Sequence, residues 1–199
     1  VGENNGFAEE DFEFDPATGT ITSYNGFATY LAIPETIGGA AVKAIGPKAF
    51  AQHTYIALAE LPEGLETIGD NAFYNCETLA RVVFPSTLKS LGVYASSSAY
   101  RSNVLELPSV EHIGPSAFYA IGVADALELP EGLKTIGDSA FEACRNMGDL
   151  YLPSTLEAIG SNAFKGDYNI QYVVLNSETP PALGENVFVG CDYLAHIDL

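Results

Sequence analysis

Apolar and small residues recur along most of this chain with a period of 22 to 24 positions. An aliphatic residue followed by glycine marks each period, and four residues later comes an aromatic column that is phenylalanine in all units but one. The glycines are Gly46, Gly69, Gly92, Gly114, Gly137, Gly160 and Gly184, and the aromatic column is Phe50, Phe73, Ser96, Phe118, Phe141, Phe164 and Phe188. A fixed period in this range predicts a solenoid, because each unit buries its apolar face only against its neighbours.

One full unit, residues 61–84, reads L-P-E-G-L-E-T-I-G-D-N-A-F-Y-N-C-E-T-L-A-R-V-V-F. Its glycine predicts a tight turn with φ > 0, and the alanine before the aromatic column allows a close approach between coils. The proline ends a strand, because it cannot donate a ladder hydrogen bond. Only about ten residues separate Ile68 from Leu79, which leaves room for short strands such as residues 65–68 and for brief helical turns, but not for long helices.

This unit resembles the leucine-rich repeat of bacterial BspA-like and Treponema-type surface proteins, whose pattern is L-x-x-I-x-L-P-x-x-L-x-x-I-G-x-x-A-F-x-x-C. The resemblance implies a leucine-rich repeat solenoid, β-rich α/β, with a right-handed superhelix, a concave parallel sheet, short convex strands and helical turns. The pattern departs over residues 91–103, where Ser96 replaces the aromatic residue. We interpret this unit as a decayed repeat rather than a functional loop, and we expect Tyr94 or Tyr100 to fill the gap.

The repeats cover residues 33–199, about seven units of 22 to 24 residues, and residues 1–32 lie outside the period. Residues 11–26 contain two alternating runs around a D-P-A-T-G turn, which predicts a β-hairpin. The end coil of a solenoid must hide its apolar face, so we expect residues 1–32 to be an N-terminal capping hairpin.

Composition excludes several functions. The chain carries 26 acidic and 8 basic residues, a net charge of −18, which argues against nucleic-acid binding and against docking on anionic lipid. No segment has the ~18 consecutive apolar residues that a membrane span needs, so membrane insertion is not expected. The acidic cluster at residues 9–15 could attract Ca²⁺, but it lacks the D-x-[DN]-x-[DN]-G spacing, and we predict no metal.

The three cysteines, Cys76, Cys144 and Cys191, each follow the aromatic column by three residues and so occupy equivalent positions on different coils. With coils spaced like strands, the separations are ~14 and ~10 Å, beyond the ~7 Å Cα limit of a disulfide. These separations also prevent the cysteines from sharing a zinc ion. We therefore expect free, buried thiols that pack as small hydrophobic groups.

No catalytic constellation is visible. The histidines His53, His112 and His196 occupy different repeat positions, so no common site gathers them. The chain has no nucleophile elbow, phosphate-binding loop, metalloprotease helix or dinucleotide fingerprint. We predict a protein that is not an enzyme and that holds no cofactor.

In leucine-rich repeats the strand after the cysteine position lines the concave sheet, and alternate residues of a strand point outward. Tyrosine and arginine are favoured as interface anchors. We predict Tyr151 and Tyr172 as apolar anchors, and Glu106, Glu128 and Asp149 as an acidic surround that suits a basic or hydroxyl-rich partner. The candidate binding residues are Glu60, Arg81, Glu106, Glu128, Asp149, Tyr151, Tyr172 and His196.

The resemblance implies a bacterial module, extracellular or at the cell surface, whose secretory signal peptide has been removed or is not included. Such a module would serve in adhesion or recognition, and its expected partner is a host or microbial surface protein or glycoprotein. We expect a monomer. The alternative is a structural spacer that displays other domains of a larger surface protein, and an enzyme is the least expected class.

Overall fold

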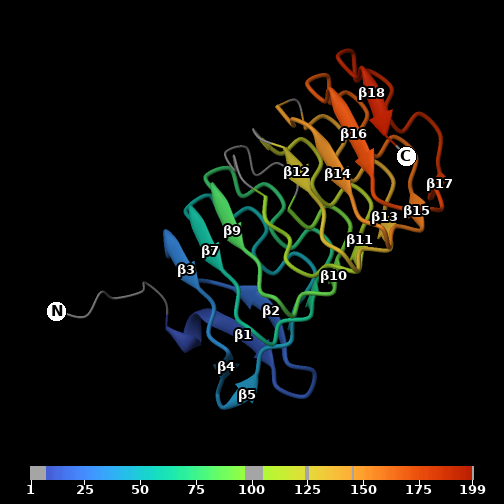
Figure 1. Cartoon of the computed structure of the whole chain (residues 1–199). Helices are drawn as coiled ribbons and strands as arrows, with labels where there is room; N and C mark the ends of the chain where they lie inside the picture. The colour runs from blue at the N-terminus through green and yellow to red at the C-terminus, as the bar shows by residue number, and fades with distance from the viewer. Residues whose placement is uncertain (1–7, 97–104, 124–125, 145, 199) are drawn as a thin grey trace.

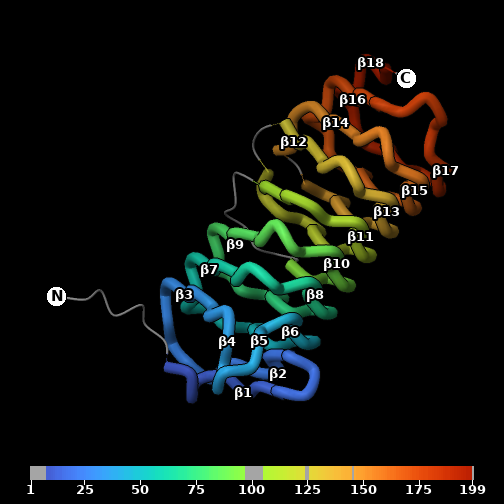
Figure 2. The backbone as a smooth tube through the Cα atoms, turned by 60° about the horizontal axis from the view of Figure 1, so that its bottom comes forward, coloured from blue at the N-terminus to red at the C-terminus, as the bar shows by residue number. Residues whose placement is uncertain are grey.

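The computed structural model describes residues 8–96, 105–123, 126–144 and 146–198. The chain winds into a stack of about seven coils, which runs from the N-terminal hairpin to β18 (Figures 1 and 2). Every coil adds a strand to one long sheet, and most coils add a second strand to one of two shorter sheets. The predicted leucine-rich solenoid with parallel sheets is confirmed.

The long sheet has nine strands, and all its pairings are parallel except that of β1 with β2. Equivalent aliphatic residues lie side by side in it, as Ile45 pairs with Ile68 and Ile113 pairs with Ile136. Its strands, in order, are β1 (Phe12–Asp15), β2 (Thr20–Tyr24), β6 (Ala44–Ile45), β8 (Thr67–Ile68), β10 (Ser90–Leu91), β11 (His112–Ile113), β13 (Thr135–Ile136), β15 (Ala158–Ile159) and β17 (Ala182–Leu183).

The two shorter sheets follow one another along the stack, and we call the surface they form the two-sheet face. The first sheet contains β3 (Tyr30–Ala32), β7 (Leu58–Glu60) and β9 (Arg81–Val83). The second contains β12 (Leu127–Glu128), β14 (Leu150–Leu152), β16 (Tyr172–Leu175) and β18 (His196–Asp198). This is the face that the sequence assigns to the concave side. A separate hairpin, β4 (Thr36–Ile37) and β5 (Ala40–Ala41), completes the strands of the described residues.

The predicted helical turns around the aromatic column are wrong. In the unit of Phe73 the chain forms successive β-turns, with Ala72 N–H bonded to Gly69 O at 3.3 Å and Tyr74 N–H bonded to Asn71 O at 3.1 Å. Asn71 has φ 56° and Asn75 has φ 57°, and such left-handed residues interrupt a right-handed helix. Within the described residues, the one helix is the short 3₁₀ turn η1 (Glu9–Asp11). None of these residues forms a helix long and apolar enough to cross a membrane.

The repeated glycines serve a different purpose from the predicted positive φ. Gly69 and Gly137 are absent from the residues with positive φ. A Cβ on Gly69 would lie 2.8 Å from Pro47 N, and one on Gly137 would lie 2.5 Å from Pro115 N. The preceding coil therefore leaves no space for a side chain, and the left-handed conformation falls two residues later.

Stacked phenylalanines fill the interior. Ring centroids are 5.1 Å apart between Phe50 and Phe73, and 5.3 Å apart between Phe118 and Phe141. Further along, the rings of Phe164 lie 5.4 Å from Phe141 and 5.6 Å from Phe188. Ser96 interrupts this column between Phe73 and Phe118.

The prediction that Tyr94 fills the gap at Ser96 is wrong. Tyr94 is 39% exposed, and its ring meets Tyr74 and Tyr119 outside the core. Tyr100, the other candidate, lies outside the described residues. The ring of Phe84, from the end of the preceding unit, meets Phe118 edge-on with centroids 6.4 Å apart. The gap is thus filled from a different position of the repeat.

The N-terminal hairpin closes the first end of the aromatic column. Phe12 of β1 packs on Tyr24 of β2 at 5.0 Å, and Tyr24 packs on Phe50 at 5.5 Å. β2 also pairs in parallel with β6, and β3 pairs in parallel with β7. Residues 20–32 therefore add a coil to the stack while β1 covers its end.

Candidate binding pocket on the two-sheet face

The two-sheet face is interrupted in the unit that lacks its column phenylalanine. Residues 105–107 stand where a strand is due between β9 and β12, and they form none. Figure 1 shows this interruption between the green strand β9 and the yellow strand β12. The sequence predicts one continuous parallel sheet on this face, but the described strands form two sheets, because residues 105–107 do not continue the ladder from β9 to β12.

Seven of the eight predicted binding residues lie in or directly beside the strands of this face, and Glu106 lies at the interruption. Glu128 pairs in register with Tyr151, Tyr151 pairs with Val174, and Tyr172 pairs with His196. The ring centroids of Tyr172 and His196 lie 6.4 Å apart, with the rings edge to face. The strand register thus sets the expected outward positions side by side on successive coils.

A pocket of about 550 Å³ opens at the interruption. Four of the eight predicted residues line it, namely Arg81, Glu106, Glu128 and Tyr151. The full lining comprises residues 81–84, 105–108 and 128–131, together with Ala126, Tyr151, Pro153 and Asn176. Glu60, Asp149, Tyr172 and His196 lie on the same face but outside this pocket.

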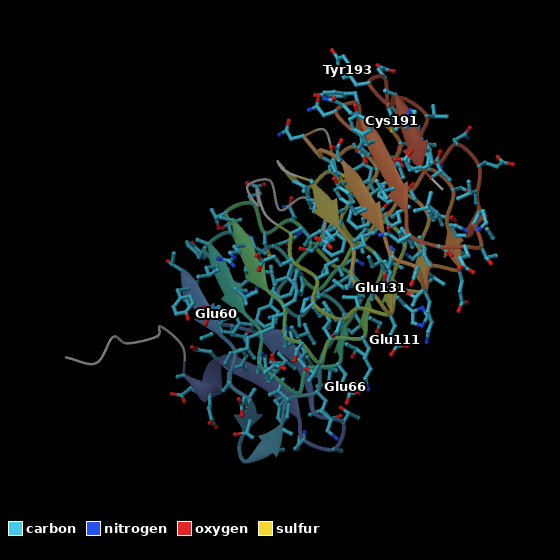
Figure 3. The ribbon with its side chains drawn as sticks, in the orientation of Figure 1. Glu60, Glu66, Glu111, Glu131, Cys191 and Tyr193 are labelled. Atoms are coloured by element: carbon cyan, nitrogen blue, oxygen red, sulfur yellow. The ribbon has the colours of Figure 1, made fainter. Side chains whose placement is uncertain are left out.

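The carboxylates in the pocket differ in how they are engaged. Glu106 faces the Arg81 guanidinium at 3.6 Å, and both side chains are more than half exposed, so the pair stabilises the fold by no more than about 1 kcal/mol. Glu131, labelled in Figure 3, accepts hydrogen bonds from the Ser154 N–H at 3.1 Å and the Ser154 hydroxyl at 2.8 Å. Glu128 makes no hydrogen bond or ion pair with any described residue.

Outside the pocket, two predicted residues are held by their own neighbours. Glu60, labelled in Figure 3, accepts a hydrogen bond of 2.6 Å from the hydroxyl of Tyr30 in β3. This bond raises the pKa of Tyr30. Asp149 accepts the backbone N–H of Tyr172 at 3.1 Å. These carboxylates therefore fix the local strands more than they present a free charge.

Sequence reasoning missed the prolines and the apolar wall of the pocket. Pro108, Pro130 and Pro153 open successive units and line one side. Val83 and Leu105, both half-buried, add aliphatic surface. The recurring proline before each new unit is the signal that could have located this wall.

The cysteines are free and buried, as expected. Each thiol donates to the carbonyl of the column phenylalanine on the preceding coil, Cys76 to Phe50 at 3.0 Å, Cys144 to Phe118 at 3.2 Å and Cys191 to Phe164 at 3.2 Å. Burial raises the pKa of Cys76 to about 11, and it raises the pKa of Cys144 as well. A thiol held neutral is a poor nucleophile.

Other candidate chemical groups do not converge. His53 packs against Tyr24, and His112 Nδ1 lies 2.9 Å from the Thr135 hydroxyl. His196 lies 3.6 Å from Asp198. Among the described residues, no three His, Cys, Asp or Glu side chains form a group that could hold a metal ion. In the N-terminal acidic cluster, Glu9 accepts the N–H of Gly38 at 3.0 Å.

One buried acid was not anticipated. Asp167 follows Phe164 by three residues and so occupies the cysteine position of its coil. It is fully buried, and neither carboxyl oxygen has a hydrogen-bond partner among the described residues. Burial is the largest effect and raises the pKa of Asp167 to about 9, while the nearby backbone N–H of Cys144 lowers this pKa and the charge of Glu142 raises it. The group is thus a neutral acid in the core, and it does not line the pocket.

Comparison with known families identifies the repeats. The model of the BspA type leucine rich repeat region, in six copies, matches residues 20–125 and 111–199. This chain belongs to the BspA-type leucine-rich repeat family. A comparison with the curated proteins gives no match.

Solved structures share the fold. A T. pallidum leucine-rich repeat protein (TpLRR) is similar with 28% identity and a TM-score of 0.85, over 95% of this chain and 90% of that one. A leucine-rich cell surface protein of Faecalibacterium prausnitzii A2-165 has 27% identity and a TM-score of 0.79, over 98% of this chain but 55% of its own length. A leucine-rich repeat protein of Bacteroides ovatus has 18% identity and a TM-score of 0.58, which speaks to the fold alone.

Proposed function

We propose that this BspA-type repeat chain is a non-enzymatic recognition module of a bacterial surface, and that its two-sheet face binds a protein or glycoprotein. The observation that carries the proposal is the pocket of about 550 Å³ at the interruption between β9 and β12. Ligand sites are concave and combine apolar surface with a few polar groups. This pocket combines Tyr151, Arg81 and two carboxylates with an aliphatic and proline wall.

Three further observations support a recognition role over catalysis. The F. prausnitzii relative is described as a cell surface protein. Solenoids expose long surfaces that suit binding. The titratable groups of the described residues are dispersed along the stack, and the thiols are buried with raised pKa values. The description of this relative supports a proposed location at the cell surface or outside the cell, and we propose a monomer.

The test is a pull-down with immobilised host and microbial surface proteins and glycoproteins, followed by a Tyr151→Ala/Tyr172→Ala variant. These rings are 38% and 46% exposed and stand on neighbouring coils, and rigid aromatic side chains lose little entropy on binding. We expect the variant to keep its fold and lose most of its partner binding. Undiminished binding by a folded double variant would refute the assignment to this face.

A matched control removes two other exposed tyrosines. Tyr74 and Tyr168 are 41% and 38% exposed and lie in turns outside the strands of the two-sheet face. A Tyr74→Ala/Tyr168→Ala variant should bind like the parent chain. An equal loss in both double variants would indicate a general effect of surface tyrosines rather than a site.

The spacer function is favoured by one specific observation, the ladder of bonds between coils. Glu63 accepts the N–H and hydroxyl of Ser86 on the next coil, at 3.0 and 2.8 Å. Exposed ion pairs join Lys89 to Glu66 at 3.0 Å and Lys134 to Glu111 at 2.8 Å (both glutamates are labelled in Figure 3). A spacer would retain no partner in the pull-down, whereas a recognition module would.

A further inference from the structure

The charge of the pocket on the two-sheet face is unbalanced. Glu106, Glu128 and Glu131 contribute three carboxylates, and Arg81 contributes one cation. Arg81 already forms an ion pair with Glu106 at 3.6 Å, and Glu131 already accepts a hydrogen bond from the Ser154 hydroxyl. The carboxylate of Glu128 remains without a partner among the described residues, and the whole chain adds a net charge of −18 around it. An incoming cation is thus favoured over an anion.

Glu128 and Tyr151 form one recognition element. They are partners in the parallel pair of β12 and β14, and both side chains are exposed on the same face. Paired strands lie ~4.8 Å apart, so the two side chains leave the sheet as neighbours on one face. A cation held by the carboxylate would then lie within the ~6 Å of a ring centroid over which cation–π attraction acts. The Tyr151 hydroxyl has no hydrogen bond with any described residue.

The remaining wall suits an aliphatic stem. Val83 and Leu105 are half-buried, and Pro108 is exposed at the side of the pocket. Lysine and arginine carry a charged head on a flexible apolar chain, and such side chains bury the stem while the head stays polar. A sugar, by contrast, offers no positive charge to an unpartnered carboxylate.

We infer that the pocket between β9 and β12 binds a lysine or arginine side chain of a polypeptide partner, with Glu128 pairing the charge, Tyr151 stacking on it, and Arg81 competing for the neighbouring Glu106. The inference rests on the proposed recognition function and names the partner chemistry of the same site. It assigns to Arg81 the role of a specificity residue, since its charge opposes the ligand and its removal frees a second carboxylate.

The probe is a short fluorescein-labelled peptide of alternating lysine and glycine, followed by fluorescence anisotropy at about 50 mM and about 300 mM salt. A peptide of alternating glutamate and glycine and the polyamine spermidine are the comparison ligands. The inference predicts binding of the lysine peptide that weakens with salt, no binding of the glutamate peptide, and weak competition by spermidine. Spermidine competing as well as the unlabelled peptide would overturn the assignment to a polypeptide.

Single substitutions separate this pocket from general attraction to an acidic protein. Glu128→Gln should weaken the lysine peptide about tenfold, as the loss of a charge pair beside a ring predicts. Glu157→Gln, an exposed carboxylate next to β15 of the long sheet, removes the same charge elsewhere and should leave affinity within about twofold, since it only lowers the general field. Equal effects of the two substitutions would overturn the inference.

Two further substitutions distinguish a cation from a hydroxyl-rich ligand. Arg81→Met keeps an unbranched apolar stem without the charge and should strengthen binding of the lysine peptide several-fold, whereas a ligand that needs the guanidinium would bind more weakly. Tyr151→Phe keeps the ring and should bind like the parent, while Tyr151→Leu should lose about fivefold. Weaker binding of Arg81→Met, or equal losses in both Tyr151 variants, would refute the cation assignment.

Failure of the inference is distinguishable from failure of the proposed function. If a partner from the pull-down is lost by Tyr151→Ala/Tyr172→Ala but binds Glu128→Gln and Arg81→Met like the parent, recognition on the two-sheet face stands and the basic ligand is refuted. If neither set changes partner binding, the face itself is refuted.

Discussion

Asp167 occupies the position on its coil that Cys144 occupies on the preceding coil, three residues after the column phenylalanine. The thiol of Cys144 donates to a backbone carbonyl, whereas both oxygens of Asp167 lack partners among the described residues. The carboxyl is buried between the coils of Cys144 and Cys191, where burial raises the pKa of both thiols, and a charge on Asp167 would raise them further. The position that holds a buried cysteine thiol on other coils therefore holds, on this coil, a carboxyl group that is protonated in the folded state.

Because Asp167 is buried, we predict that its contribution makes the folded protein more stable at low pH than at high pH. The folded pKa is about 9 against a reference value of 3.8. The carboxyl is therefore protonated in both states below the reference value, and only in the folded state between the two values. Its contribution to stability falls as pH rises from about 4 to about 9, by at most about 1.4 kcal/mol per pH unit.

Asp167→Cys restores the repeat pattern and should remove this pH dependence. Urea unfolding at pH 5 and pH 8 measures it, with Asp167→Asn as a second uncharged variant. The free energy of unfolding of the variants should exceed that of the parent mainly at pH 8, by on the order of 3 kcal/mol for Asp167→Cys. Carboxylates with a lowered pKa, such as Glu111 beside Lys134, contribute a pH dependence of the opposite sign. This contribution is the same in parent and variants, so it cancels when their unfolding free energies are subtracted. An unchanged pH slope in both variants would contradict the prediction.

Truncation inside the phenylalanine stack should be costly. Phe118 and Phe141 are 1% and 0% exposed and stack face to face. Replacing either with alanine should lower the free energy of unfolding by ~3–5 kcal/mol, as large core truncations do. Phe188 is only partly buried at the end of the stack, so Phe188→Ala is the control and should lower the free energy of unfolding by less. Urea melts decide, and a loss below about 1 kcal/mol at Phe118 would show that the ring does not carry the core.

The period predicts the buried residues of the interior well, because the same type of residue recurs at each column position in several coils. Ile68, Phe73 and Cys76 are buried as their columns require. The turn conformation is not predictable from the glycine column alone. Glycine suggests positive φ, but here the backbone of the adjacent coil takes the space of its Cβ. Asn71 and Asn162 were the sequence signal for the left-handed sites.

The candidate pocket depends on a departure from the period, and a repeat pattern does not specify such departures. Ser96 marks the altered unit, yet nothing in the pattern says that Phe84 turns in to fill the gap or that residues 105–107 leave the sheet. The regular part of the period does place Glu128 and Tyr151 at equivalent strand positions of successive coils, where the structure pairs them. Asp167 escaped notice because an acid is ordinarily expected at the surface.

The close approach of coils at the glycine column predicts a large effect of one methyl group. In Gly137→Ala the new Cβ would meet Pro115 N at 2.5 Å, a backbone atom that cannot move aside without shifting the coil. We expect a loss of at least about 2 kcal/mol in urea melts, as overpacking against backbone produces. Ser139→Gly, two residues later at φ 55°, should instead be neutral or stabilising by up to about 1 kcal/mol. Equal effects of the two changes would contradict this division of roles.

Ser96 and Phe84 should show compensation. The space lined by Ser96, Phe84 and Phe118 is about 20 Å³, far too small for a ring. Ser96→Phe alone should therefore destabilise by about 1–3 kcal/mol, because the new ring collides with Phe84. The equivalent position of the neighbouring unit is Leu107, so Ser96→Phe/Phe84→Leu recreates the regular column.

A double-mutant cycle in urea measures the coupling between these two positions. The single change Phe84→Leu should also destabilise, since it uncovers the edge of Phe118 without supplying another ring. The double variant should recover most of both losses, with an interaction energy of at least about 1 kcal/mol between the two sites. Additive losses would show that Phe84 does not occupy the place of the missing column ring, and the packing account of the altered coil would then be wrong.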